Sequence, residues 1–349
     1  MTLPTPKHIL VARTDKIGDL LLSLPVFQAL KKAFPRTRVT ALVSSYTQEL
    51  VQDHPAIDRV ATVEKTDGVF KLAGRLKEIA PDTFLILYPR PKVVLAAWLA
   101  GIPVRIGSAY RWYSPFLNQK VPLHRSSNDR HEAEYNLEML KPLGVISADK
   151  KIELPLSKSE RDFAGDFLKE KGLKSKTRFV VVHPGHRGSA LNWKPERYAQ
   201  LVERLCKTKG LRVVLTGGAE ETAIIARVTA NLPGLSPDQK PVLIIGELGL
   251  KQLAAVYENA LCFVSGSTGT MHLAAAVGTP TVSLFSPAPE TTAVRWGPWG
   301  NESTVLVPKG LTCEACKIGH CESHDPMDGI DVSDVLEAVR KHLLRAKTK

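Results

Sequence analysis

Two polar turns, far apart in the sequence, carry side chains that can do acid–base and anion-binding chemistry. The first, Thr14–Asp19, follows the apolar segment His8–Arg13 and ends with Gly18 and Asp19. A carboxylate in the first turn of a helix complements the helix dipole, which accounts for most such residues. A carboxylate on a rigid element can also act as a general base. Asp19 is therefore a candidate base, and Asp15 in the same turn competes for that role.

The second turn, Gly266–Gly269, lies between the apolar run Leu261–Ser265 and a stretch of small residues, Thr270–Val277, that is typical of a buried helix. A strand that passes through such a turn directly into a helix leaves the first backbone N–H groups of the helix without intrahelical partners. These groups can bind an anion such as a diphosphate, although an ordinary strand–helix–strand crossover has the same pattern. His272, one turn into the helix, either donates to such an anion or is satisfied locally.

Two further loops place glycine and polar side chains directly after predicted strands. His183–Ser189 follows Arg178–Val182, and its Gly185 lets the backbone approach a ligand while Arg187 can meet a phosphate. Thr216–Glu220 ends the next strand and can hold a base or a ribose. Each loop can equally be a solvated surface loop.

Several common nucleotide motifs are missing from the sequence. It has no GxGxxG, which argues against a dehydrogenase, and no GxxxxGK[ST], which excludes a P-loop enzyme. It has no GxSxG elbow of an α/β-hydrolase. No Asp-x-Asp pair is present to hold a divalent ion on a sugar nucleotide. These absences favour nucleotide-diphosphate chemistry without a metal motif.

The elements that must position these turns alternate between strand and helix, which predicts parallel sheets with right-handed crossovers. The predicted strands are His8–Arg13, Arg38–Val43, Arg59–Val63, Thr83–Tyr88, Arg178–Val182, Leu211–Thr216, Val242–Ile245, Leu261–Ser265 and Thr281–Phe285. The predicted helices begin near Asp19 and continue through Phe34, then cover Thr47–Asp53, Val69–Ile79, Val93–Leu99, Pro195–Lys209, Glu220–Ala230, Leu250–Glu258, Thr270–Val277 and Val332–Leu344. Because ligands bind at the carboxyl ends of strands in such sheets, both turns lie where a site is expected.

The strand–helix rhythm stops and restarts, which predicts two α/β domains, each a doubly wound parallel sheet, facing each other across a cleft. A chain of 349 residues is long enough for two cores. Ile152–Lys176, first proline-bearing and then charged, is expected to be a linker with one connecting helix. We expect an N-terminal domain over 1–155, a C-terminal domain over 156–330, and a final helix with a basic tail over 331–349.

The composition indicates an ordinary globular chain with an unusual charge. Hydrophobic residues make up 44%, and the net charge is +12. Aromatic residues are only 6%, and no basic stretch is interleaved with aromatics, so a membrane-associated acidic substrate is favoured over nucleic acid. Val93–Val104 is too short to span a bilayer, and the N-terminus lacks the apolar segment of a signal peptide. We expect a cytoplasmic protein.

Three of the five cysteines, Cys313, Cys316 and Cys321, lie close together beside His320 and His324. Thiolates and imidazoles at such intervals can hold zinc or iron. No second Cys-x-x-Cys is present, so the ligands would have to come from this segment alone. Reduced thiols in a loop are the favoured interpretation, and no metal site is predicted.

Four segments together resemble glycosyltransferase family 9, the ADP-heptose:lipopolysaccharide heptosyltransferases. They are ILVARTDKIGDLLLSLPVFQALKKAFP, HPG with SALNWKPERYAQLVERL, VVLTGGAEE, and STGTMHLAAAVGTPTVSLFSP. The cysteine-rich segment before the final helix also resembles the C-terminal region of the family. The resemblance covers nearly the whole chain.

The resemblance implies a GT-B fold of two Rossmann-like domains, with the acceptor in the N-terminal domain and the nucleotide sugar in the C-terminal one. It also implies an inverting, direct displacement that uses neither a metal nor another cofactor. Asp19 matches the catalytic aspartate of the family, which deprotonates an acceptor hydroxyl for attack on the anomeric carbon of the heptose. Thr268, Gly269 and His272 would stabilise the leaving ADP.

The donor-binding residues that we expect come from the loops that follow strands of the C-terminal domain. They are Gly185, Arg187, Lys194, Thr216, Gly217, Glu220, Ser267, Thr268, Gly269 and His272. Glu220 matches an acidic family residue only loosely.

Two positions depart from the family pattern on the donor side. Ser267 stands where heptosyltransferases usually carry an acidic residue or Asn, and Leu191 stands in place of a lysine two residues before Trp193. Lys194 lies on the other side of that tryptophan. These departures leave open a family 9 transferase with another nucleotide-sugar donor, a sugar-nucleotide epimerase, and a non-catalytic nucleotide-sugar binder.

We therefore expect a transferase that moves heptose from ADP-heptose, or a related sugar, to the lipid A–core acceptor of lipopolysaccharide. It would be peripheral at the inner face of the inner membrane. Basic residues near an anionic membrane surface gain roughly 1 kcal/mol each, which fits the net charge of +12.

Overall fold

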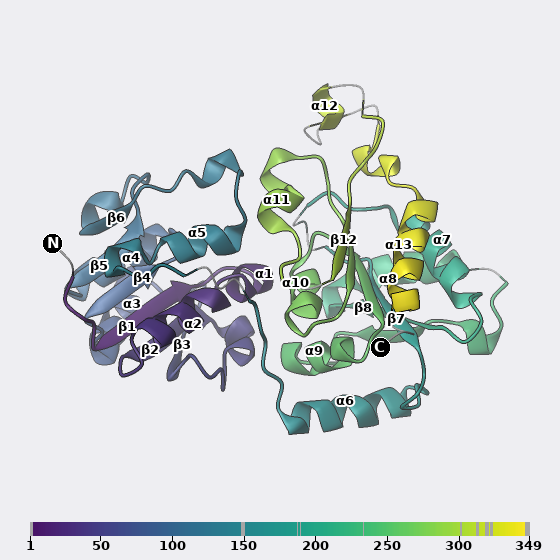
Figure 1. The fold of residues 1–349 in the computed structure, drawn as a ribbon, viewed down its shortest axis with the longest axis horizontal. Coiled ribbons are helices and arrows are strands. Elements are labelled where there is room, and N and C mark those ends of the chain that lie inside the picture. Colours follow the sequence, from purple (N-terminus) through teal and green to yellow (C-terminus); the bar gives the residue numbers. More distant parts are fainter. Residues whose placement is uncertain are drawn as a thin grey trace. The chain divides into compact units, whose positions relative to one another are not determined.

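The computed structural model describes residues 3–147, 151–186, 188, 190–232, 234–300, 302–311, 314–317, 321 and 324–345. The chain forms two compact units, Met1–Leu154 and Pro155–Lys349, each built on its own sheet (Figure 1). In the described part of the chain, no helix is both long and apolar enough to cross a bilayer.

The first unit is a six-stranded parallel sheet in the order β3-β2-β1-β4-β5-β6. Its strands are β1 (His8–Arg13), β2 (Arg38–Ser44), β3 (Arg59–Val63), β4 (Thr83–Ile86), β5 (Val104–Ser108) and β6 (Gln119–Val121). Its helices are α1 (Ile17–Leu21), α2 (Leu24–Ala33), α3 (Val69–Ile79), α4 (Pro91–Leu99) and α5 (Glu132–Glu138), with 3-10 turns η1 (Ser45–Leu50), η2 (Ser114–Phe116), η3 (Arg125–Ser127) and η4 (Lys141–Leu143).

The second unit is also a six-stranded parallel sheet, in the order β12-β11-β10-β7-β8-β9. Its strands are β7 (Phe179–His183), β8 (Arg212–Gly217), β9 (Val242–Ile245), β10 (Cys262–Gly266), β11 (Thr281–Leu284) and β12 (Ser303–Leu306). Its helices are α6 (Lys158–Glu170), α7 (Pro195–Cys206), α8 (Thr222–Ala230), α9 (Leu250–Glu258), α10 (Gly269–Ala276), α11 (Ala293–Trp296), α12 (Glu314–Lys317) and α13 (Val332–Arg345). Its 3-10 turns are η5 (Ala219–Glu221), η6 (Pro237–Gln239), η7 (Pro289–Thr291) and η8 (Pro326–Gly329).

The two sheets have the same winding, because counting strands from the first of each unit gives the order 3-2-1-4-5-6 in both. This is the Rossmann order, in which the direction of winding reverses between the first and fourth strands. The reversal falls between β1 and β4 in the first unit and between β7 and β10 in the second. Ligands bind outside the carboxyl ends of the strands at such a point. The loops after β1, β7 and β10 are therefore the places where a site is expected.

The central strands of both sheets are almost entirely apolar and buried, and alternate side chains pack on opposite faces of the sheet. In the first unit, α3 and α4 cover one face and pack against Leu10, Phe84 and Ile86. In the second, α7 and α13 cover the face that carries Val182 and Val264. Helices lie on both faces of each sheet, as a doubly wound fold requires (Figure 1).

The fold confirms the predicted α/β class, and most predicted elements end within a few residues of their expected bounds. The long first helix is one difference, since it is two helices that break at Leu22 and Ser23. Pro25 lies in the first turn of α2, where its missing N–H costs nothing, and so it begins a new helix. The segment Thr47–Asp53 forms the 3-10 turn η1 instead of an α-helix.

Six helices and strands were missed by the sequence reasoning: β5, β6, α5, α11, β12 and α12. All of them except α5 have five residues or fewer, and β6 and β12 lie at sheet edges, where a strand needs no long apolar run. The helix α5 is rich in charged residues and therefore lacks the apolar periodicity of a core helix.

Candidate active site

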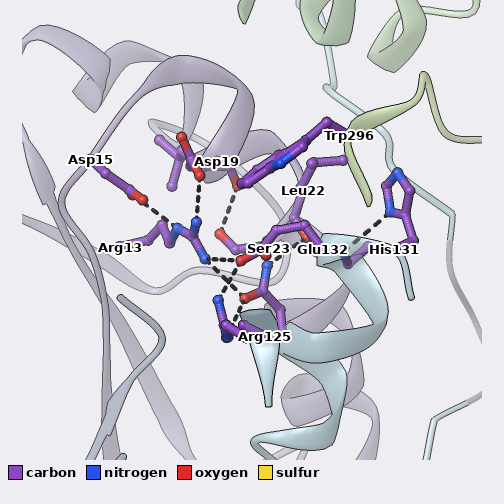
Figure 2. Close-up of polar contacts among 12 residues, drawn as sticks. Arg13, Asp15, Asp19, Leu22, Ser23, Arg125, His131, Glu132 and Trp296 are labelled. Carbon is purple, nitrogen blue, oxygen red and sulfur yellow. Dashed lines mark hydrogen bonds and ion pairs between the residues drawn. The ribbon is translucent and has the colours of Figure 1, made fainter. Parts of the chain in front are cut away.

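The strongest polar cluster in the first unit centres on Arg13, the last residue of β1. Its guanidinium is only 1% exposed and donates from Nε to Asp15 (2.9 Å) and from Nη2 to Asp19 (2.6 Å), both in the turn that follows the strand (Figure 2). Asp19 lies in the first turn of α1. The strand therefore carries the cation, and the helix that follows carries the carboxylate, at the reversal point of the sheet.

The opposite side of Arg13 is held by α5, more than a hundred residues later. Arg13 Nη1 donates to Glu132 Oε1 (3.0 Å) and to Asn136 Oδ1 (2.9 Å). Arg125, from η3, also donates to both side chains (Figure 2). Asn136 in turn donates from Nδ2 to the backbone oxygen of Leu22 at the end of α1 (3.1 Å).

This cluster fixes the helix that carries Asp19. A capping box of His131 and Glu134 starts α5 and sets Glu132 at its first position. Sequence reasoning missed Glu132, Asn136 and Arg125. The one signal was an arginine at the end of an otherwise apolar strand, because a cation there needs carboxylate partners from elsewhere in the fold.

The carboxylates of Asp15 and Asp19 differ in their surroundings. The side chain of Asp15 is 7% exposed and that of Asp19 is 16% exposed. Burial raises the pKa of Asp15 to about 7, the charge of Asp19 adds to the rise, and the charge of Arg13 opposes it. Among the described residues, none donates a hydrogen bond to Oδ2 of Asp19. Asp19 thus combines one anchored oxygen with a second one open to a substrate hydroxyl, as a general base requires.

The second unit presents the predicted anion-binding turn at the end of β10. Thr268 is the N-cap of α10, and its Oγ1 accepts from the backbone N of Met271 (3.4 Å). Its φ of −136° is extended, so the helix begins cleanly at Gly269. His272 is buried one turn further on, and Ser267 is half-buried. The first N–H groups of an eight-residue helix thus lie at the reversal point of the sheet, where they can stabilise a diphosphate.

The loop after β7 packs directly against this turn. Asn192 donates from Nδ2 to the backbone oxygen of Pro184 (2.9 Å), and its Oδ1 accepts from the Tyr198 hydroxyl (2.7 Å). A Cβ on Gly266 would lie 2.4 Å from that Oδ1. Gly266 is therefore a glycine because the amide of Asn192 crosses the end of β10 at this point.

A buried polar cluster joins the ends of β7 and β8. His183 Nδ1 lies 3.0 Å from Thr216 Oγ1, and its Nε2 lies 3.5 Å from Glu221 Oε2. The Glu221 carboxylate also accepts from Gly218 N (2.8 Å). A Cβ on Gly185 would lie 2.1 Å from that carboxylate, so the backbone of the loop passes directly over it. Sequence reasoning named the neighbouring Glu220 as a donor-binding candidate and did not consider Glu221.

The remaining predicted donor residues lie around these two clusters in different environments. Glu220 is exposed, and Gly217 ends β8 next to Ile225. Lys194 is half exposed, and its Nζ lies 3.2 Å from an Asp328 carboxylate oxygen. Leu191, where the family pattern has a lysine, is exposed.

Arg187, Cys313 and His320 lie outside the described residues. Cys321 is described, with its Sγ 4.0 Å from His324 Nδ1. Within the described ranges, no group of three or more His, Cys, Asp or Glu side chains is arranged to hold a metal ion.

Comparison with known proteins places the chain in a family. The sequence model described as glycosyltransferase family 9 (heptosyltransferase) matches residues 69–324, a range that includes the α10 turn and begins after Asp19. A Haemophilus influenzae protein named "Putative glycosyltransferase" is 30% identical over 84% of this chain and 86% of its own length. The Escherichia coli protein named lipopolysaccharide heptosyltransferase 3 is 26% identical over 81% of this chain and 82% of its own.

A solved structure has the same fold. The E. coli ADP-heptose lipopolysaccharide heptosyltransferase II structure aligns over 97% of this chain and 99% of its own, with a TM-score of 0.80 at 22% identity. This likeness confirms the predicted α/β fold of two Rossmann-like, doubly wound units of the GT-B type. Together with the sequence matches, it leads to one conclusion: the chain belongs to glycosyltransferase family 9 and is a glycosyltransferase.

Proposed function

We propose that the chain transfers heptose from ADP-heptose to the lipid A–core acceptor during synthesis of the inner core of lipopolysaccharide. The observation that carries this proposal is Asp19, anchored at the reversal point of the first sheet by an arginine that two elements hold in place. The E. coli relatives, named as lipopolysaccharide and ADP-heptose heptosyltransferases, support the choice of donor and acceptor.

The chemical step begins at the acceptor hydroxyl. Oδ2 of Asp19 takes the hydroxyl proton, and the oxygen attacks the anomeric carbon of the heptose from the face opposite the diphosphate. The new C–O bond forms as the bond to the diphosphate oxygen breaks, and ADP leaves with that electron pair. This direct displacement inverts the anomeric centre, and a positioned carboxylate base contributes about 10²–10⁴-fold to such a step.

We assign the stabilisation of the leaving diphosphate to the second unit. Thr268, Gly269 and His272 lie at the start of α10, where the helix dipole and the first N–H groups favour negative charge. The loop residues Gly185 and Thr216, around the buried carboxylate of Glu221, would contact the nucleoside of the donor. In this proposal the backbone and side chains stabilise the diphosphate, and no metal or other cofactor takes part.

The acceptor is an anionic amphiphile, so we propose that the enzyme works at the cytoplasmic face of the inner membrane. A basic hollow of about 600 Å³ at the amino ends of β7 and β8 supports contact with an anionic surface. Its cations are Lys174, Lys176, Arg178, Lys207, Lys209 and Arg212. Among the described residues, only Lys207 of these cations forms an ion pair, with Glu203 at 2.7 Å. The hollow contains no aromatic residue to stack a base, which argues against nucleic acid.

The direct test uses purified protein, ADP-heptose and a heptose-deficient core acceptor. We expect acceptor-dependent release of ADP and a glycolipid heavier by one heptose. ADP-heptose that stays intact with every core acceptor would overturn the donor assignment.

A different nucleotide-sugar donor is the second candidate, because Ser267 and Leu191 depart from the family pattern on the donor side. A thermal-shift screen of nucleotide sugars separates the two, since a ligand that binds only the native state raises the melting temperature. A larger shift with another nucleotide sugar than with ADP-heptose would favour this candidate. Product formed without an acceptor would instead indicate an epimerase, and tight donor binding without any turnover would indicate a binding protein.

A further inference from the structure

Arg13 carries two carboxylates on one edge of its guanidinium. The Nε and Nη2 hydrogens of an arginine lie on the same edge of its plane, where one carboxylate usually accepts both. Here Asp15 accepts from Nε at 2.9 Å and Asp19 from Nη2 at 2.6 Å. The edge is thus shared by two carboxylates, which brings two like charges side by side (Figure 2).

The charges around this edge do not cancel. Glu132 is already paired with Arg125, and both side chains are well buried, at 0% and 14% exposed. Among the described residues, Arg13 is the cation that forms ion pairs with both Asp15 and Asp19. Two uncharged groups also contact the cluster: Tyr46 donates its hydroxyl to the backbone oxygen of Asp15 (2.9 Å), and the Tyr88 ring lies 5.7 Å from the Arg13 guanidinium carbon. The Arg90 guanidinium lies on the same Tyr88 ring, 4.9 Å from its centre.

We infer that Asp15 is a positioning residue that sets the basicity of Asp19, so that the two carboxylates and Arg13 work as one acid–base unit. When Asp15 is ionised, its charge lies beside Asp19 and strengthens Asp19 as a base. When Asp15 is protonated, Asp19 faces Arg13 alone and is a weaker base.

The burial of the two side chains assigns the roles. The Asp15 side chain is the more buried, at 7% exposed, and the Asp19 side chain is the more exposed, at 16%. The proton that relieves the repulsion therefore resides on Asp15, whose pKa is raised to about 7. Asp19, the more exposed of the two carboxylates, is the one that faces the acceptor hydroxyl in this inference.

The first test of this inference is kinetic and therefore rests on the proposed function. It measures how kcat for sugar transfer depends on pH. In the wild type, the rate of sugar transfer should rise as the pH passes through about 7, because Asp15 loses its proton there. Asp15→Asn keeps the hydrogen bond from Arg13 but removes the charge. This variant should lack the rise and remain at the lower rate, with donor affinity unchanged.

Tyr46→Phe is the matched control, because it alters the same turn without changing any charge, and it should keep the wild-type profile. A rise near pH 7 that survives in Asp15→Asn would overturn the inference. Circular dichroism of each variant establishes that it is folded.

A second measurement needs no turnover and so separates this inference from the proposed function. Carboxyl carbon NMR can follow the titration of Asp15 in the wild type and in Asp19→Asn. Removal of the neighbouring charge should lower the midpoint of Asp15 by about one pH unit. An unchanged midpoint would show that the two carboxylates do not interact, whatever reaction the enzyme catalyses.

Discussion

The buried charge of Glu132 offers a test of how Asp19 is held in place. Glu132→Gln keeps the shape of the side chain and an oxygen that can accept a hydrogen bond, but it removes the charge. The Glu132 side chain is 0% exposed and accepts from Arg13 and Arg125. The change therefore leaves two largely buried guanidinium groups with less compensating charge.

The expected cost follows from that geometry. Removing one partner of a buried ion pair costs about 3–5 kcal/mol, and the lower end applies because Asp15 and Asp19 still face Arg13. A loss of about 3 kcal/mol corresponds to a roughly hundredfold loss of protection against amide hydrogen exchange. Exchange measured by mass spectrometry on peptides from β1, α1 and α5 reports this loss in the first unit by itself.

Glu138→Gln is the matched control on the same helix. Glu138 pairs with Arg130 and Lys141 near the surface, and its side chain is 20% exposed. Surface ion pairs contribute about 0.2–1 kcal/mol, so protection should change by a few-fold at most. Equal losses in the two variants, or unchanged protection in Glu132→Gln, would refute the reasoning that Glu132 anchors the cluster.

Three further predictions concern stability and reactivity. The folded chain raises the pKa of Asp15 from 3.8 to about 7, so in that range the native state binds more protons than the unfolded state. The stability of the wild type, from urea unfolding, should therefore fall relative to Asp15→Asn as the pH rises from about 4 to about 7, and the difference should stay level above that. Gly185→Ala should lower the unfolding temperature of the second unit, because the new Cβ displaces the buried carboxylate of Glu221 at a cost of about 2 kcal/mol; an unchanged temperature in calorimetry would contradict this. Burial raises the pKa of the Cys206 and Cys262 thiols to about 11 and about 12, so alkylation at pH 7.5 followed by peptide mapping should find both unmodified until the chain unfolds.

The sequence alone was sufficient for the fold because the information is local. Apolar runs such as His8–Arg13 and Val242–Ile245 are bounded by turns, and they correspond to β1 and β9 with unchanged bounds. The alternation with helices then dictates a parallel, doubly wound arrangement. Elements with little apolar periodicity, such as α5, left no such signal.

In each cluster, the sequence could predict only those residues that directly follow a predicted strand. Asp19 and Thr268 follow predicted strands directly, so their position at the carboxyl end of a sheet follows from the pattern. Glu132 and Asn136 reach Arg13 from α5, and that contact depends on tertiary packing across more than a hundred residues. Sequence spacing contains no information about such a distant partner.

The lack of packing information in the sequence also explains why Glu220, and not Glu221, was predicted as a donor-binding residue. Two adjacent acids in a loop look alike in the sequence, and only the path of the backbone decides which one is buried. In the structure Glu221 is buried under Gly185, whereas Glu220 is exposed.

The measurement that bears most directly on the account is single-turnover transfer of heptose by the wild type and by Asp19→Asn, with donor affinity measured separately. The account predicts that Asp19→Asn lowers the rate of transfer by about 10²–10⁴-fold and leaves the Kd for ADP-heptose nearly unchanged, because Asp19 acts only on the acceptor hydroxyl. Full transfer activity in the Asp19→Asn enzyme would contradict the account and remove Asp19 from the mechanism.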